Sequence, residues 1–440
     1  MTARARLLIL LLTLALLVPV SAAHAKDGLW QRYTNHMDGV LDHVIEMDLW
    51  GISTPQLPKG IWKIKYQYNH QKVNKRFGDH GEKLPFAPSL SFPDLLGSDE
   101  DVFFVDLQGK TGGGKGAGHT FQMSYGITDP LDFYIELPFQ YAEVQFDVQY
   151  EPGDLPDWKW NLYKTMLMGA DLRNVEGFWQ FIESMGRPRL KEKYKTDTLD
   201  LGDIHFGLSW NYYKGEYFAA ATTNRMYIPS GYQPDANNTI DLFTGAGFPA
   251  GQHAFGLSTT QGFDFRLPKP FRWVVFNLDF TYEYRFKSRR HAPKFPERTP
   301  YFDSLFGLLE VEDPEMAAIF PDLRDMGDYY YITFGHSLDG EIGITINPFK
   351  IIPIGIKYAA GWSQEPDIQS NSEQFNDYIK DVEIIGEMQQ QVLAVGTGIS
   401  LIPFYIPLNI IFEYRHMLTG KGALVVEDNF LITTELFLTF

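Results

Sequence analysis

The chain has 440 residues with 38 basic and 55 acidic side chains, which gives a formal net charge of -17. This acidic excess argues against nucleic acid or another polyanion as a partner. The chain contains no cysteine, which excludes disulfides, thiolate metal sites, a c-type haem attachment and a lipid-anchored cysteine. Its 11 histidines show no ligand spacing, so we expect no cofactor and no metal.

Residues 1–25 have the pattern of a secretory signal peptide. Arg4 and Arg6 precede an apolar run from residue 7 to residue 17, and Ala23-His24-Ala25 fits a cleavage site. The run is too short to cross a ~30 Å hydrocarbon layer, for which about 20 residues are needed. We therefore expect an exported protein whose mature chain begins at Lys26.

The next segment, residues 26–58, has apolar residues at helical spacing before Pro55 and Pro58. They are Met37, Val40, Leu41, Val44 and Ile45. We expect a small helical plug inside the structure formed by the rest of the chain, or a helix that lies beneath that structure.

From residue 59 onward, apolar and polar residues alternate along recurring segments. In the clearest one, residues 274–287, one face is wholly apolar or aromatic and the other is mostly charged. The expected strands are 59–71, 119–127, 131–150, 199–213, 216–228, 253–266, 272–287, 329–347, 349–364, 389–402, 405–418 and 425–440. Each is long enough to cross a membrane, since 9 to 11 tilted residues suffice.

The connections between these segments alternate between short and long. The short ones contain turn-forming residues and fall at 128–130, 214–215, 267–271, 347–349 and 403–404. This alternation is typical of outer-membrane barrels with short periplasmic turns and longer extracellular loops. We predict an all-β fold, a transmembrane antiparallel up-and-down barrel of about 12 strands (12–14) over residues 59–440, with both termini in the periplasm. Pro138 and a phase change near Ala142 predict a bulge in the third strand.

Two long connections have the helical spacing of apolar residues, so we predict helical extracellular loops. Because an apolar helix on such a loop must cover something, six residues are gate candidates for a solute path. They are Trp160, Phe178, Trp179, Phe181, Leu305 and Phe306. The alternative is that these side chains only pack inside a lid.

The polar face of each predicted strand should line the lumen. The candidates are Asp203, His205, Asp279, Glu283, Arg285, Glu341, Glu413 and Arg415. They carry both signs of charge, which suggests interior salt bridges. Holding the barrel wall together is the alternative to binding a solute, because inward positions of any such barrel are polar.

Two motifs with the spacing of catalytic or phosphate-binding loops do not meet the requirements of those sites. Residues 109–116 have the spacing of a phosphate-binding loop but end in Gly where Ser or Thr should stand, so we expect a flexible loop. Residues 335–340 are similar to a lipase nucleophile elbow with one residue too many. There His336 and Ser337 would point to opposite faces of a strand, so we expect no enzyme and keep a lipid hydrolase as an alternative.

Four short motifs lie in the middle of the chain in a fixed order. They are Thr128-Asp129-Pro130-Leu131-Asp132, Leu201-Gly202-Asp203-Ile204, Ile228-Pro229-Ser230-Gly231 and Thr244-Gly245-Ala246-Gly247. Together they resemble the phenol-degradation, meta-pathway-associated outer-membrane transporter family, although Leu201 stands where that family often has Gly and Ser230 replaces Thr. The resemblance implies a barrel that transports aromatic or other hydrophobic compounds.

The last strand ends in Phe440 and resembles the terminal-aromatic signal read by the outer-membrane barrel insertion machinery. We therefore predict a Gram-negative outer-membrane channel for a small, hydrophobic or aromatic solute, in contact with outer-membrane lipid and lipopolysaccharide. Besides the lipid hydrolase, the other alternative is a structural barrel that serves as a scaffold for a secreted partner.

Overall fold

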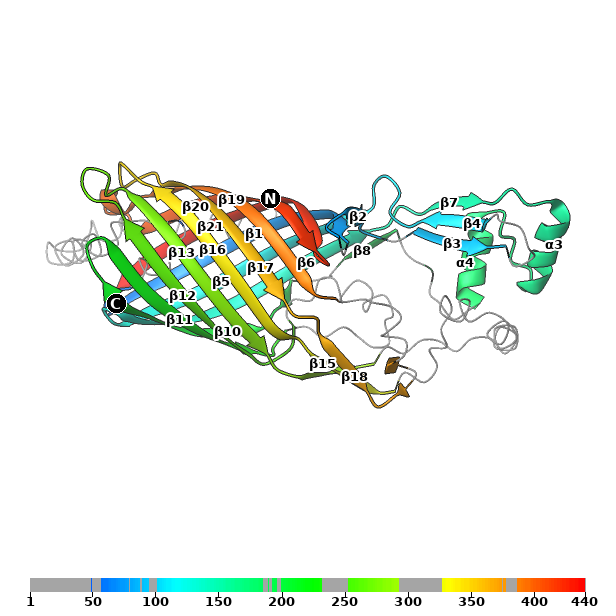
Figure 1. Cartoon of the computed structure of the whole chain (residues 1–440), viewed down its shortest axis with the longest axis horizontal. Helices are drawn as coiled ribbons and strands as arrows, with labels where there is room; N and C mark the ends of the chain where they lie inside the picture. Colours follow the sequence, from blue (N-terminus) through cyan, green and yellow to red (C-terminus); the bar gives the residue numbers. More distant parts are fainter. Residues whose placement is uncertain are drawn as a thin grey trace, which may run out of the picture.

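The computed structural model describes residues 57–94, 101–184, 192–195, 199–231, 252–292, 327–376 and 386–439, without residues 79, 88 and 374, and the single residues 49 and 189. Within this part of the chain, twelve strands form a closed antiparallel sheet (Figure 1). They are β1 (Ile61–Phe77), β5 (Gly113–Thr128), β6 (Leu131–Gln145), β10 (Ile204–Lys214), β11 (Phe218–Ile228), β12 (Gly256–Arg266), β13 (Val274–Arg285), β16 (Gly335–Ile346), β17 (Ile354–Ser363), β19 (Met388–Ser400), β20 (Leu408–Lys421) and β21 (Leu424–Thr439). Because β21 pairs with β1 and β6 pairs with β10, the sheet closes, and the predicted barrel is confirmed.

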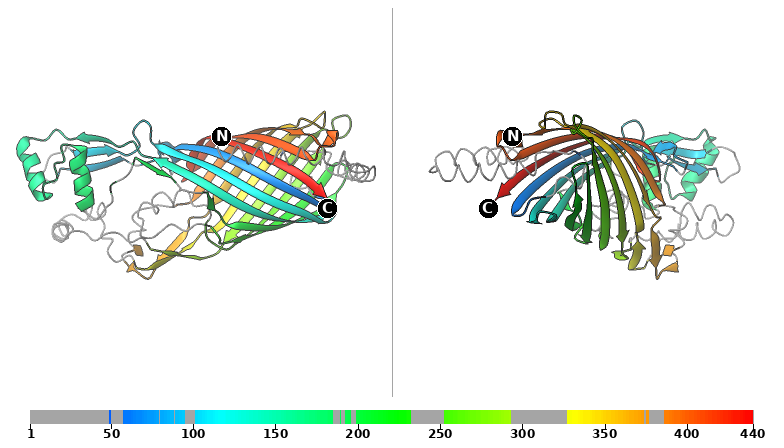
Figure 2. Two further views of the ribbon diagram at one scale, coloured as in Figure 1. Left: turned by 180° about the vertical axis from the view of Figure 1, so that it is seen from behind. Right: turned by 60° about the vertical axis from the view of Figure 1, so that its left-hand side comes forward.

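The period-2 alternation of the strands separates the two faces of the barrel. Along β13, Phe276, Phe280 and Tyr282 are exposed on the outside, whereas Asn277 and Asp279 are buried inside. Hydrocarbon offers no hydrogen bonds to unpaired backbone groups, so only a closed sheet with an apolar outer face is stable there. The strands tilt along the whole barrel, as the view from behind also shows (Figure 2).

The two ends of the barrel differ in the length of their connections. At one end, here called the short-turn end, five brief connections join β5 to β6, β10 to β11, β12 to β13, β16 to β17 and β19 to β20; the last contains η1 (Ile402–Phe404). The first residue of β1, Ile61, pairs with Thr439 of β21 at this same end. The long connections leave the opposite end, here called the loop end.

Three expectations about the strands were wrong in detail. The predicted strand 329–347 is divided, because Gly335 has a φ of +72° and turns the chain between β15 (Tyr329–Thr333) and β16. The glycine-rich residues 113–116 are not a loop; they begin β5, where all four pair with β6 and residues 114–116 also pair with β1. No bulge interrupts the pairing of β5 with β6 near Ala142. Pro138 lies where the other partner of β6 changes from β10 to β9 (Asp200–Leu201), so its missing N–H is not needed.

Short strands extend the structure beyond the loop end. β14 (Ser288–His291), β15 and β18 (Asp367–Ser370) form one small sheet, while β2 (Lys83–Pro85) pairs with β1, and β8 (Lys193–Lys195) and β9 pair with β6. A second small sheet contains β3 (Ser89–Pro93), β4 (Asp101–Asp106) and β7 (Gln149–Pro152). It packs with the helices α3 (Asp157–Met166) and α4 (Val175–Ser184), and we call this unit the loop layer.

The loop layer lies at the far right of Figure 1, beyond the barrel. Its helix α3 follows Pro156, with Asp157 in the first turn and Lys164 in the last, as the helix dipole favours. The prediction of a helical first loop is therefore confirmed. Among the described residues, no helix is long and apolar enough to cross a membrane.

Candidate functional site

One side of the lumen is filled by interlocked side chains from β6, β10, β11, β12 and β13, here called the filled wall. Arg225 Nε donates to the Tyr134 hydroxyl at 2.8 Å, and His205 Nδ1 lies 2.9 Å from a carboxylate oxygen of Glu136. The His205 ring also meets the Tyr227 ring edge to face at 4.5 Å. Tyr134 and Tyr227 are both buried, so little space remains beside this wall.

The filled wall continues to the rim of the loop end through Arg285. Its Nε donates to Glu283 at 2.6 Å, and its Nη1 lies 3.4 Å from an Asp203 carboxylate oxygen. Asp203 also accepts the backbone N–H groups of Gly231 at 3.1 Å and Gln252 at 2.9 Å. One buried carboxylate therefore holds both ends of the connection between β11 and β12.

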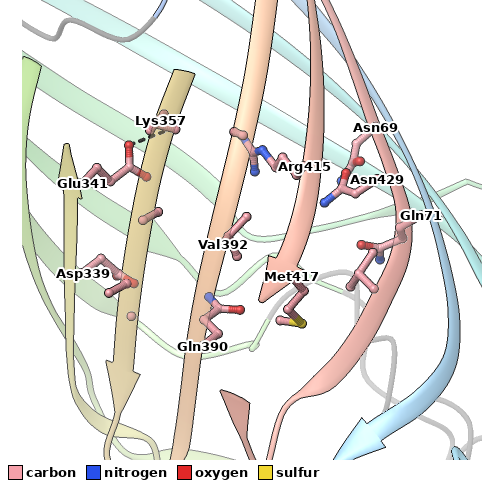
Figure 3. A pocket seen from close by; sticks show the side chains of 15 residues that line it. Asn69, Gln71, Asp339, Glu341, Lys357, Gln390, Val392, Arg415, Met417 and Asn429 are labelled. Carbon is pink, nitrogen blue, oxygen red and sulfur yellow. Dashed lines mark hydrogen bonds and ion pairs between the residues drawn. The ribbon is translucent and has the colours of Figure 1, made fainter. Parts of the chain in front are cut away.

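The remaining wall leaves a cavity of about 290 Å³, here called the lumen cavity (Figure 3). The labelled side chains that line it come from β1, β16, β17, β19, β20 and β21. They are Asn69, Gln71, Asp339, Glu341, Lys357, Gln390, Val392, Arg415, Met417 and Asn429. The space exists because Ala359, Gly361 and Ala394 supply almost no side-chain volume to the same wall.

Charges in and beside the lumen cavity are unequally balanced. Lys357 Nζ lies 2.9 Å from Glu341, and Arg415 Nε lies 2.5 Å from Glu413. Asp339 has no ion-pair or hydrogen-bond partner for its carboxylate among the residues that the structure describes. Among these five residues, three carboxylates face two cations, and the cavity favours positively charged or hydrogen-bonding groups.

Two backbone features determine where carboxylates lie beside the lumen cavity. A Cβ atom at Gly361 would lie 2.4 Å from Asp339 Oδ1, so only glycine lets that carboxylate lie against the neighbouring strand. Asp279 and Glu341 are direct cross-strand partners in the register of β13 and β16. Like charges at directly opposite positions destabilise a sheet, and the ion pair of Lys357 with Glu341 offsets part of this repulsion.

All eight predicted lumen residues lie within the described part of the chain. His205, Glu283 and Arg285 belong to the filled wall, and Asp203 lies at its rim. The other members face the lumen cavity or lie beside it; they are Asp279, Glu341, Glu413 and Arg415. Their part in moving a solute stays a prediction.

Four of the predicted gate residues lie in the core of the loop layer. Trp160, Phe178, Trp179 and Phe181 are all buried, and Phe181 is 0 % exposed. Phe178 packs edge to face against Phe103 at 5.2 Å. This burial favours the alternative of packing inside a lid, and a gating role stays a prediction. Leu305 and Phe306 lie outside the described residues, and so do the expected signal peptide, residues 1–25, and residues 26–48 and 50–56 of the expected helical segment.

A buried ionic group stabilises the loop layer. The Asp94 carboxylate accepts hydrogen bonds from the Lys159 ammonium and, at 2.5 Å, from the Tyr163 hydroxyl. The Asp94 side chain is fully buried, so removing Lys159 would take away the opposite charge of this carboxylate, whereas removing the Tyr163 hydroxyl would take away one of its hydrogen bonds. These bonds connect the residue that follows β3 to the helix α3.

Two other groups of the loop layer have shifted pKa values. Arg173 donates from Nε and Nη2 to the two carboxylate oxygens of Asp171 at 2.8 and 2.7 Å, which holds the pKa of Asp171 well below its usual value. Burial raises the pKa of Tyr150, whose hydroxyl donates to the Leu172 carbonyl. At neutral pH both groups therefore keep the protonation states on which their hydrogen bonds depend.

The serine and histidine of the elbow-like segment lie on opposite faces of β16. His336 Nδ1 lies 2.8 Å from the Tyr282 hydroxyl on the outer face, whereas Ser337 pairs in register with Glu283 of the lumen face. A nucleophile and base in this relation cannot exchange a proton. In addition, no group of three or more potential ligands within the described residues could hold a metal.

Asp339 and Lys357 belong to the lumen cavity but were not among the predicted site residues, and neither were Lys63 and Lys65 on the inner face of β1. The sequence indicates these four residues only by their position, because each is a polar residue on the face of its strand opposite the apolar one. Asp339 lies inside the elbow-like segment of residues 335–340, two residues after Ser337.

Comparisons with known proteins show likeness of fold. No family model matches the chain, and no curated protein matches it. A COG4313 outer membrane channel from Pseudomonas putida F1 matches with 9% identity over 89% of this chain and 100% of that chain, at a TM-score of 0.50. The P. putida toluene transporter TodX has 11% identity over 87% and 91% of the two chains, at a TM-score of 0.33. A Pseudomonas aeruginosa FadL homologue has 8% identity over 86% and 90%, at a TM-score of 0.29. The likeness to the COG4313 channel shows that the chain has the fold of a bacterial outer-membrane β-barrel channel.

Proposed function

We propose that this chain is an outer-membrane channel for a small organic solute. The observation that supports it most directly is the lumen cavity, a polar space beside a filled wall in a closed barrel with an apolar outer face. Twelve strands lie between the filled interior of eight-stranded barrels and the wide pores of sixteen-stranded ones, which suits a narrow path. In this proposal, the short-turn end and both termini face the periplasm.

The solute that best matches the lumen cavity is an aromatic molecule that carries a cationic or hydrogen-bonding group. The family resemblance of the sequence implies an aromatic or hydrophobic compound. The lumen cavity adds amides from Asn69, Gln71 and Asn429, an excess of carboxylate, and the apolar side chains of Val392 and Met417. A ring could contact the apolar side chains while its polar group meets an amide or Asp339.

Uptake into liposomes that contain the purified protein tests this proposal. Benzylamine, benzyl alcohol and benzoate have similar size but differ in charge, and we expect uptake rates in that order. Protein inactivated by boiling is the control for leakage through lipid. The absence of flux for all three would overturn the channel proposal, whereas faster uptake of benzoate would overturn only the preference for cationic solutes.

We further propose that residues 26–58 plug part of the lumen from the short-turn end. Leu57 is 1 % exposed, and its N–H lies 3.4 Å from the lumen carboxylate of Asp132 on β6. A Cβ atom at Gly126 would lie 2.1 Å from the Pro58 carbonyl oxygen, so glycine allows the entering chain to pass against β5. Deletion of residues 26–55 should raise the single-channel conductance, and an unchanged conductance would contradict the plug.

Residence in the outer membrane completes the proposal. The apolar outer faces of the strands would contact outer-membrane lipid and lipopolysaccharide, and the terminal strand with Phe440 would be read by the insertion machinery. Fractionation with outer membranes and a change of gel mobility on boiling are the expected results. A protein found only in soluble fractions would contradict this location.

A further inference from the structure

Four neutral polar residues form a compact block on the outer face of β11 and β12. In the register of the two strands, Thr222 pairs with Gln261 and Asn224 pairs with Thr259. We call these four residues the outer polar block. Its position is unusual, since outward residues of a membrane barrel normally form an apolar band.

Neighbouring side chains establish that the outer polar block faces lipid. Thr223 bonds Ser209 and Arg225 bonds Tyr134 in the lumen, so Asn224 between them points outward. Its cross-strand neighbour Leu208 is 46% exposed on that outer face.

The block also lies near the middle of the membrane. Gln261 is five residues from each end of the 11-residue strand β12, and Asn224 is near the centre of β11, which also has 11 residues. Because 9 to 11 residues cross the hydrocarbon region, both residues lie far from the headgroups.

Hydrogen bonding inside the outer polar block is incomplete. Gln261 Nε2 donates to the Thr222 hydroxyl at 2.8 Å, and Gln261 accepts from the Tyr212 hydroxyl at 3.5 Å. The Asn224 amide is exposed, and no described residue bonds it. Lipid tails can neither donate nor accept hydrogen bonds, so this amide requires a polar partner from elsewhere.

The surface around Asn224 is hollow enough to receive another surface. A groove of about 720 Å³ surrounds this residue, with Leu208, Met226, Leu257 and Tyr284 among its lining residues. A second groove of about 690 Å³ has Thr259 and Gln261 in its lining, together with residues of β13, β16 and β17. The block is therefore part of a shaped surface that protein side chains could fill.

We propose that the outer polar block is the contact between two copies of this chain in the membrane. A side-chain amide has both donors and an acceptor, so two Asn224 side chains can bond each other in both directions about a two-fold axis. The block carries no charge, so two copies with a net charge of -17 can meet there without placing charges opposite each other. A lipid occupant lacks the required groups at this depth.

The absence of cysteine makes the interface directly testable by crosslinking. A Thr259→Cys variant keeps Asn224 and places a thiol beside it, whereas Val395→Cys places a thiol at an exposed position of β19 as the matched control. With a short bifunctional maleimide in native membranes, we expect a dimer from Thr259→Cys and none from Val395→Cys. Absence of the Thr259→Cys dimer, or equal crosslinking of both variants, would overturn the proposal.

The role of the amide is tested by adding Asn224→Leu. We expect the double variant Asn224→Leu/Thr259→Cys to lose the crosslink, and Asn224→Leu alone to raise the dimer dissociation constant in detergent about tenfold. The boiling-dependent shift in gel mobility should be unchanged, which separates loss of association from loss of folding. A monomeric wild-type protein, or a dimer unaffected by Asn224→Leu, would overturn the proposal. Both tests are independent of any solute flux.

Discussion

Replacing Asp339 by asparagine tests whether the charge of the lumen cavity selects the ions that pass. Asp339 has no ion-pair partner among the described residues, whereas the neighbouring Glu341 is paired with Lys357. Asparagine has nearly the same shape, and Gly361 leaves room for it, so the barrel should fold normally. We expect the variant to lose most of its preference for cations.

The size of this effect follows from Coulomb's law in a water-filled lumen. A monovalent ion that passes about 7 Å from a carboxylate gains or loses about 0.6 kcal/mol at the dielectric constant of water. This energy favours a cation by a factor of about 2.7 and disfavours an anion by the same factor. Because the two factors multiply, removing the charge lowers the ratio of cation to anion permeability about sevenfold. At 0.1 M salt, where the Debye length is about 10 Å, the expected change is about threefold.

The zero-current potential of the protein in a planar bilayer, under a tenfold gradient of potassium chloride, measures this ratio. Lys357→Met should shift the potential in the opposite direction, because it frees the Glu341 carboxylate. Asp171→Asn, in the loop layer, is the control for a charge removed outside the lumen. An Asp339→Asn channel with an unchanged potential, or a wild-type channel that prefers anions, would refute the reasoning.

Three further changes test the loop layer, the pH dependence of the turn that Asp147 holds, and membrane insertion. Phe181→Ala removes a fully buried ring and should destabilise the loop layer by about 3–5 kcal/mol, so protease should cut residues 146–184 faster while the barrel keeps its gel mobility; unchanged cleavage would contradict the assigned core. Asp147 accepts the N–H groups of Lys110 and Thr111 and the Thr111 hydroxyl, which together hold the pKa of its carboxyl below the ordinary value of 3.8. A lowered folded-state pKa means that the stabilisation is present above pH 3.8 and is lost as pH falls through the lower folded value. Amide-exchange protection of Thr111, corrected for intrinsic rates, should therefore decrease in that acidic range in the wild type and show no such transition in Asp147→Asn. Deletion of Phe440 should reduce the inserted, boiling-sensitive fraction in cells, while Phe440→Tyr should retain it; equal insertion of all three chains would exclude the terminal signal.

The strands could be predicted from sequence because their two faces meet different surroundings. In β13, the alternation of Phe276, Asn277 and Leu278 reports lipid on one side and lumen on the other, whatever the neighbouring strands contain. Connection lengths add the order of the strands, because a two- or three-residue turn can only join antiparallel neighbours. These two signals depend on residues close together in the chain, and they yielded the twelve strands.

The lumen cavity could not be predicted in the same way, because it depends on register between strands. Whether Asp339 has a cation beside it is decided by Gly361 and Gln390 on the next strands, 22 or more residues away in the chain. The same applies to residues 113–116, whose glycines indicate a loop although they pair with β6 and, from residue 114, with β1. The type of a side chain indicates the face of the strand on which the residue lies. Its partner on the neighbouring strand depends on the register of the closed sheet, which the sequence pattern does not give.

The filled wall and Leu57 lie on the same side of the lumen. Leu57 approaches Asp132 on β6, a strand that also supplies Tyr134 and Glu136 to the filled wall. Space for a solute therefore remains along β16, β17, β19, β20 and β21, where small residues leave the lumen cavity open. Because the filled-wall charges are already engaged with one another, they chiefly stabilise the barrel. The cavity charges lie beside the remaining space, so in the proposed channel the path of a solute would run past Asp339 and its neighbours.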